Sequence, residues 1–193
     1  MTGNRKVHRR SLAATLAVAL AVAAGAAALA GSAGAMLAGA RGASGSTLSR
    51  QLQAVKAATA RYHSLTQARK AGYTTAGEPC VQSPLGAMGI HAVNPPLLAS
   101  DAIDPLRPEL LLYLPGKHGK LRLVGVEYWK ADADQNLGTD GDRPLLFGTV
   151  PFDGPMPGHT PTMPIHYDLH VWLWADNPSG LFAPFNPSLA CPA

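Results

Sequence analysis

The chain has 193 residues with 16 basic and 12 acidic side chains, a formal net charge of +4 and a pI near 9.3. Residues 1–30 hold four of the basic side chains and no acidic one, so the rest of the chain is close to neutral. We expect no nucleic-acid partner, because a phosphate-binding surface needs an excess of basic residues on the folded part. The length suffices for one folded domain and excludes two large ones.

The first thirty residues have the layout of a signal peptide. Four basic residues precede an uncharged run of Ala, Val and Leu from Leu12 to Ala30, and small residues at its end offer a cleavage site. We predict a signal peptide over 1–30, a flexible Gly/Ala/Ser spacer over 31–46, and a secreted or cell-envelope location. The alternative is an uncleaved anchor, since the apolar run is about long enough to span a bilayer. Membrane contact would then involve only this N-terminal segment.

Two cysteines, Cys80 and Cys191, lie in the part of the chain that would be exported. In an oxidising compartment such a pair usually forms a disulfide bond. We predict the Cys80–Cys191 bridge, which would constrain the unfolded chain by roughly 4 to 5 kcal/mol in the entropy model. The alternative is a reactive or metal-bound thiolate.

An amphipathic helix is predicted over residues 47–71. Apolar side chains recur at steps of three and four from Leu48 to Leu65, which is the spacing of one helix face. Gly72 can adopt the left-handed conformation that ends a helix, and the basic residues just before it suit the negative end of the helix dipole.

Short apolar runs separated by Pro, Gly and Asn follow Cys80 and predict strands. The expected strands are 88–93, 110–114, 121–129 and 165–174, the second and third joined as a hairpin by a turn over 115–120. The last strand alternates between an apolar face (Tyr167, Leu169, Val171) and a polar, aromatic one (His166, Asp168, His170). The predicted fold class is α+β: the domain over 47–193 packs its helix on a mainly antiparallel, twisted sheet that curls toward a partial barrel.

Side chains able to bind metal stand among the apolar strand residues: His91, Glu127, His159, His166, Asp168 and His170. Imidazole and carboxylate are ligands of Zn, Mn, Fe and Cu. Residues four apart in a strand are separated by about 13 Å, so His166 and His170 could share one ion only if this segment were helical. The strand pattern favours His170. We therefore predict a site for one divalent ion formed by His91, Glu127 and His170, with His166 assisting and the loop over 151–164, including His159, covering it.

Glu127 is the strongest member of this set because it lies within the apolar run LRLVGVEYW, where an unpaired carboxylate is costly. For each histidine taken alone, the alternative is a structural polar residue satisfied by its neighbours. The acidic segment 132–142 resembles a calcium loop but has Leu137 and Arg143 where an EF-hand requires Gly and Glu. We interpret it as a solvated acidic turn.

The competing interpretation is a metal-free envelope module that binds a ligand or partner through aromatic side chains. Trp172 and Trp174, with Phe182 and Phe185 close behind, are the candidate ligand-binding residues. The chain has no Gly-rich phosphate loop and no Gly-x-Ser-x-Gly elbow, so the sequence defines no reaction or substrate and leaves open whether the protein is an enzyme.

Five segments carry a resemblance to other chains: GAMGIHAVNP, LRLVGVEYW, FDGPMPGH, HYDLHVWLWADNPSG and FAPFNPSLAC. With them the chain resembles, over about residues 50–191, an uncharacterised family of exported bacterial proteins. The resemblance implies that the family has His at 91, 166 and 170 and Glu at 127, whereas Ala92 stands where the family has Tyr. It implies no activity, because none is known for the family.

Overall fold

The computed structural model describes residues 45–116 and 119–192. The predicted signal peptide over 1–30 and all but the last two residues of the predicted spacer over 31–46 lie outside the described residues. Leu48–Ala193 forms one compact unit. Among the described residues, no helix has both the length and the apolar character that crossing a bilayer would require.

The first part of this unit is helical but not continuous, in contrast to the single helix expected over 47–71. Residues 45–59 are helical and lead into the 3-10 helix η1 (Ala60–His63) and the short α2 (Leu65–Lys70). Ser64 separates the last two with extended dihedral angles and accepts the first backbone hydrogen bonds of α2 through its carbonyl oxygen. Gly72 ends α2 with φ +99°, as its position in the sequence predicts.

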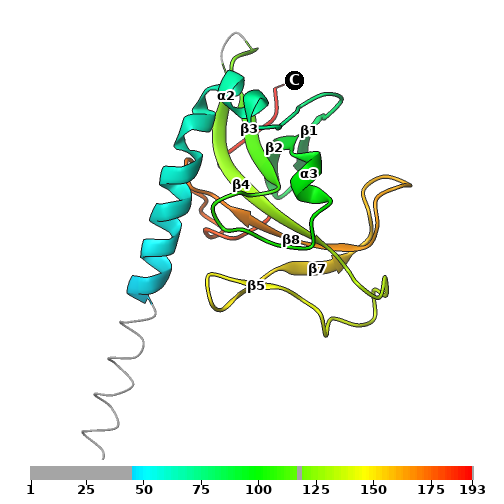
Figure 1. The fold of residues 1–193 in the computed structure, drawn as a ribbon. Helices are drawn as coiled ribbons and strands as arrows, with labels where there is room; N and C mark the ends of the chain where they lie inside the picture. The colour runs from blue at the N-terminus through cyan, green and yellow to red at the C-terminus, as the bar shows by residue number, and fades with distance from the viewer. Residues whose placement is uncertain (1–44, 117–118, 193) are drawn as a thin grey trace, which may run out of the picture. The chain divides into compact units, whose positions relative to one another are not determined.

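One antiparallel sheet forms the body of the domain, with the strand order β1-β2-β3-β4-β8-β7 (Figure 1). These strands are β1 (Cys80–Ser83), β2 (Gly86–Val93), β3 (Leu110–Pro115), β4 (Leu121–Ala131), β8 (His166–Val171) and β7 (Asp153–Met156). The short helix α3 (Pro95–Leu98) follows β2, and β5 (Leu145–Leu146) pairs with β6 (Val150–Pro151). The four predicted strands correspond to β2, β3, β4 and β8; β1 and the edge strand β7 were not expected.

The sheet is curled into a half-barrel, in agreement with the predicted fold class. Long β4 bends along its length in Figure 1. Its pairing with β3 shifts register between Leu112 and Tyr113, and irregularities of this kind increase local twist and bending. Helical residues cover one face of the sheet, and the opposite face carries the candidate site.

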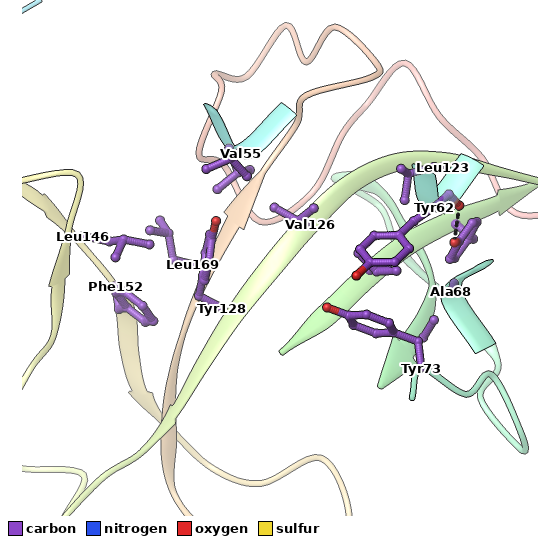
Figure 2. Close-up of a cluster of buried hydrophobic side chains, with 14 of the residues drawn as sticks. Val55, Tyr62, Ala68, Tyr73, Leu123, Val126, Tyr128, Leu146, Phe152 and Leu169 are labelled. Atoms are coloured by element: carbon purple, nitrogen blue, oxygen red, sulfur yellow. Dashed lines mark hydrogen bonds between the residues drawn. The ribbon is translucent and has the colours of Figure 1, made fainter. Parts of the chain in front are cut away.

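The helical residues cover one face of the sheet and form the larger core with it. Val55, Tyr62 and Ala68 pack against alternate strand residues, including Val126 and Leu169. Figure 2 shows these side chains gathered between the elements. The Tyr113 hydroxyl donates to the Tyr62 carbonyl oxygen at 2.5 Å and ties η1 to β3.

The opposite face has a smaller apolar cluster and the polar residues of β8. Leu112, Val124 and Trp172 are buried there, packed against Cys80 and Cys191. The predicted disulfide bond joins these cysteines, which are 111 residues apart, and holds the C-terminal segment against β1. The predicted alternation of β8 is confirmed, since Tyr167, Leu169 and Val171 belong to the larger core while the histidines face the other way.

Candidate metal site

Two of the candidate ligands face each other across neighbouring strands. Glu127 of β4 is the direct cross-strand partner of His170 of β8, so their side chains lie on the same face of the sheet. Both are buried, Glu127 to 5 % and His170 to 1 % exposure. His170 Nε2 lies 3.6 Å from Glu127 Oε2.

The third candidate reaches the same point from a strand that is not adjacent. His91 pairs with Leu112 of β3, so β3 lies between His91 and β4. Its Nε2 nevertheless approaches Glu127 Oε2 to 3.1 Å, because the curled sheet brings side chains on this face together. The side chain of His91 keeps 13 % exposure, which makes it the most accessible of the three.

These three residues can hold a metal ion between them. One ligand atom from each of His91, Glu127 and His170 falls within a group no wider than 4.8 Å. Ligands about 2.1 Å from one ion at tetrahedral angles lie roughly 3.4 Å apart, and the two measured nitrogen–oxygen distances, 3.1 and 3.6 Å, bracket that value. Neither Glu127 Oε2 nor His170 Nε2 has a partner in hydrogen-bonding geometry, although both atoms are buried.

The carboxylates and imidazoles of this cluster shift one another's pKa values. Burial by itself would raise the pKa of Glu127, but the nearby imidazoles of His170 and His91 outweigh it and lower the pKa to about 2. Burial would likewise lower the pKa of His170, and the carboxylates of Glu127 and Asp168 outweigh it and raise the pKa to about 9. In the metal-free protein at neutral pH, His170 is therefore an imidazolium held between carboxylates.

Asp168 lies on the other side of the His170 ring. Its Oδ1 is 3.5 Å from Nδ1, whereas Glu127 lies at Nε2. Since the two nitrogens of an imidazole point in different directions, Asp168 does not belong to the group that converges on one point. Asp153 of β7 pairs with Asp168, and its pKa is raised by its own burial and by that neighbouring carboxylate.

His166 is buried on the same face as His170 but outside the three-residue group. Its ring stacks on Trp129 with centroids 5.7 Å apart, and its Nδ1 lies 3.1 Å from the Pro164 carbonyl oxygen. His159, exposed on the preceding loop, meets the His166 ring edge-on at 5.2 Å. The structure thus joins His159 to His166 and leaves His91, Glu127 and His170 as a separate set.

The two tryptophans proposed as ligand-binding residues lie in different surroundings. Trp172 is buried to 3 % exposure, and its indole N–H donates to the Ala183 carbonyl oxygen at 2.7 Å. Trp174 is half-buried against the larger core, with the His63 ring 4.4 Å away and Lys56 Nζ over its face at 4.8 Å.

The acidic segment uses its carboxylates to hold its own backbone and neighbouring side chains. Asp132 accepts from the Asn136 N–H, Asp134 from the Thr139 hydroxyl, and Asp142 from both the Ala133 N–H and the Tyr167 hydroxyl. Within the described residues, metal-ligating side chains converge on one point only around Glu127. These contacts support the interpretation of the segment as an acidic turn.

Glu109 is a buried acid that sequence reasoning did not single out. It is 2 % exposed, and its Oε2 accepts from the Trp129 N–H at 3.3 Å. Burial raises its pKa to about 7, despite that hydrogen bond. Its position directly before the apolar run of β3 is the signal that could have drawn attention to it.

In comparisons with protein-family models, curated proteins and solved structures, no match to this chain was found. The function is therefore inferred from the geometry of the site.

Proposed function

We propose that the protein is an extracytoplasmic metal-binding protein in which His91, Glu127 and His170 hold one divalent ion. The observation that carries the proposal is the convergence of three ligand atoms from three strands within 4.8 Å. The buried atoms Glu127 Oε2 and His170 Nε2 lack hydrogen-bonding partners. A metal ion bound by both atoms would be their common partner.

The charge of the site supports a divalent ion. Glu127 and Asp168 place two carboxylates in contact with His170 at a buried position. Buried charges require compensation, and a divalent cation balances both carboxylates while the imidazoles bind as neutral ligands. Without a metal, protonated His170 must supply that compensation.

The donor set indicates the kind of ion and the chemistry it would support. Two imidazole nitrogens and one carboxylate oxygen suit Zn²⁺, Fe²⁺, Mn²⁺ or Cu²⁺, and the absence of thiolate from the set disfavours Cu⁺. Three protein ligands leave coordination positions open for water or a small molecule. Partly exposed His91 marks the side from which such a molecule would approach.

The extracytoplasmic part of the proposal rests on two features. The Cys80–Cys191 disulfide bond suits an oxidising compartment. The charged start and apolar run of residues 1–30 have the layout of an export signal. We also propose that the chain is a member of the family of exported bacterial proteins that it resembles.

Elemental analysis of the untagged protein tests the metal site. We expect close to one equivalent of metal in the wild type, taken up during purification or reconstitution. Glu127→Gln, which preserves side-chain shape, should contain at least tenfold less metal. His170→Ala should also lose the metal. His63→Ala is its matched control and should retain the metal, because His63 lies beside Trp174 at the larger core. Absence of metal from the reconstituted wild type would refute the proposal and favour the metal-free module with Trp172 and Trp174.

A further inference from the structure

The imidazole of His170 stands between two carboxylates, one at each ring nitrogen. Its Nε2 is 3.6 Å from Glu127 Oε2, and its Nδ1 is 3.5 Å from Asp168 Oδ1. All four atoms are buried and lack a partner in hydrogen-bonding geometry. Each ring nitrogen thus has a carboxylate oxygen within 3.6 Å.

The sheet holds Asp168 in this place. On β8 it precedes His170 by two residues, so both side chains project from the same face. It pairs with Trp129 of β4 on one side and Asp153 of β7 on the other, and it is 3 % exposed. A carboxylate so enclosed has few alternatives to the ring beside it.

We infer that Asp168 is a positioning residue of the proposed metal site: it accepts the Nδ1–H of His170 and so keeps Nε2 directed at the ion. This inference rests on the proposed function. A neutral imidazole has one N–H and one lone pair, and it binds metal only through the nitrogen that carries the lone pair. Metal-binding histidines usually donate the other N–H to a carboxylate or carbonyl group, which fixes the tautomer and the ring orientation.

Asp168 acts through His170 and is not a ligand of the same ion. An ion shared by His91, Glu127 and His170 lies on the Nε2 side of the His170 ring. Asp168 lies on the Nδ1 side. Its removal should therefore weaken metal binding without abolishing it, whereas removal of Glu127 deletes a ligand.

Titration of the full-length, disulfide-bonded protein with Co²⁺ tests the inference, because visible absorption reports both affinity and coordination geometry. Asp168→Ala should weaken Co²⁺ binding by roughly 10- to 100-fold and alter the absorption bands of the bound ion. Asp168→Asn keeps an oxygen that can accept the Nδ1–H, so it should recover part of the affinity and the wild-type bands. Asp153→Asn removes a neighbouring charge but not the acceptor, and it should change the affinity by less than about threefold.

The outcomes separate this inference from the proposed function. If the wild type binds Co²⁺ and Glu127→Gln does not, but Asp168→Ala binds with wild-type affinity and spectrum, the metal site stands and the role of Asp168 is refuted. Equal losses in Asp168→Ala and Asp153→Asn would also refute it, since charge alone would then explain the effect. Absence of Co²⁺ binding by the wild type would overturn both proposals.

Discussion

His91 Nε2 lies 3.1 Å from Glu127 Oε2, although β2 and β4 are not neighbours in the sheet. Two strand spacings in a flat sheet amount to about 10 Å, so side chains on next-but-one strands normally remain apart. Curling of the sheet toward this face brings the two residues together. The proposed site therefore depends on backbone geometry as much as on the identity of its ligands.

Gly89 offers a test of that dependence, because it lies in β2 two residues before His91. It has φ +99°, and a Cβ there would lie 2.4 Å from the Tyr113 carbonyl oxygen of β3. Gly89→Ala should destabilise the fold by roughly 3 kcal/mol or more and weaken metal binding, because β2 must move away from β3. Urea unfolding and metal titration measure the two effects.

Gly77→Ala is the matched control for this substitution. Gly77 also has a positive φ, +80°, but a Cβ there would meet no atom within 4 Å. We expect Gly77→Ala to lower the free energy of unfolding by about 1 kcal/mol through backbone strain alone and to leave the metal affinity unchanged. Equal stability losses at the two positions would show that β2 and β3 have room to separate.

Metal binding should release a proton at neutral pH. The pKa of His170 is about 9 in the metal-free protein, since the Glu127 and Asp168 carboxylates outweigh the effect of burial. His170 is then protonated at pH 7 and must lose that proton to bind an ion, so affinity should rise up to about pH 9. Calorimetric titrations at pH 7 in buffers of different ionisation enthalpy should detect the release of close to one proton per ion from His170. Binding without proton release would show that His170 is not a ligand.

Replacing Glu109 by glutamine should stabilise the protein at alkaline pH. Burial raises the pKa of Glu109 from 4.5 to about 7, so between these pH values the carboxyl group is protonated in the folded protein and ionised in the unfolded chain. The free energy of unfolding of the wild type therefore falls as pH rises through this range. Glu109→Gln retains an oxygen to accept the Trp129 N–H and does not ionise. We expect the variant's advantage over the wild type in free energy of unfolding to be about 1 to 2 kcal/mol larger at pH 8 than at pH 5. Urea unfolding at the two pH values measures this difference. The same pH dependence of the free energy of unfolding in variant and wild type would contradict the role given to Glu109.

Removing the disulfide bond should destabilise the domain strongly. The bridge closes a separation of 111 residues, and the entropy model assigns roughly 4 to 5 kcal/mol to a loop of that size. The double substitution Cys80→Ser, Cys191→Ser should therefore lower the urea midpoint, and reduced wild type should unfold at the same midpoint. An unchanged midpoint would mean that the contacts of the C-terminal segment, such as Cys191 N–H donating to Gln82 Oε1, hold it without the covalent bond.

Local periodicity was sufficient for part of the fold and of the site. Period-two alternation in β8 separated Leu169 from Asp168 and His170, because one face of the strand is apolar core and the other is not. The isolated carboxylate of Glu127 within an apolar strand identified a residue that needs a partner. Both inferences need only the sequence of one strand.

The rest depends on contacts between distant segments. β7 contains Gly154 and Pro155, which argue for a loop, and it is tolerated as a strand because it pairs along one side only, at the sheet edge. The break at Ser64 was hidden because apolar residues continue at helical spacing on both sides of it. The approach of His91 to Glu127 across β3 follows from the curl, which strand periodicity does not encode.

The most direct test of the metal site is a crystal structure of the metal-soaked protein with anomalous scattering recorded at the absorption edge of the ion. We predict one anomalous peak, about 2.0 to 2.2 Å from His91 Nε2, Glu127 Oε2 and His170 Nε2, with Asp168 at the Nδ1 side of the His170 ring. A peak held by other residues, or clear density for the three side chains with no peak between them, would contradict it.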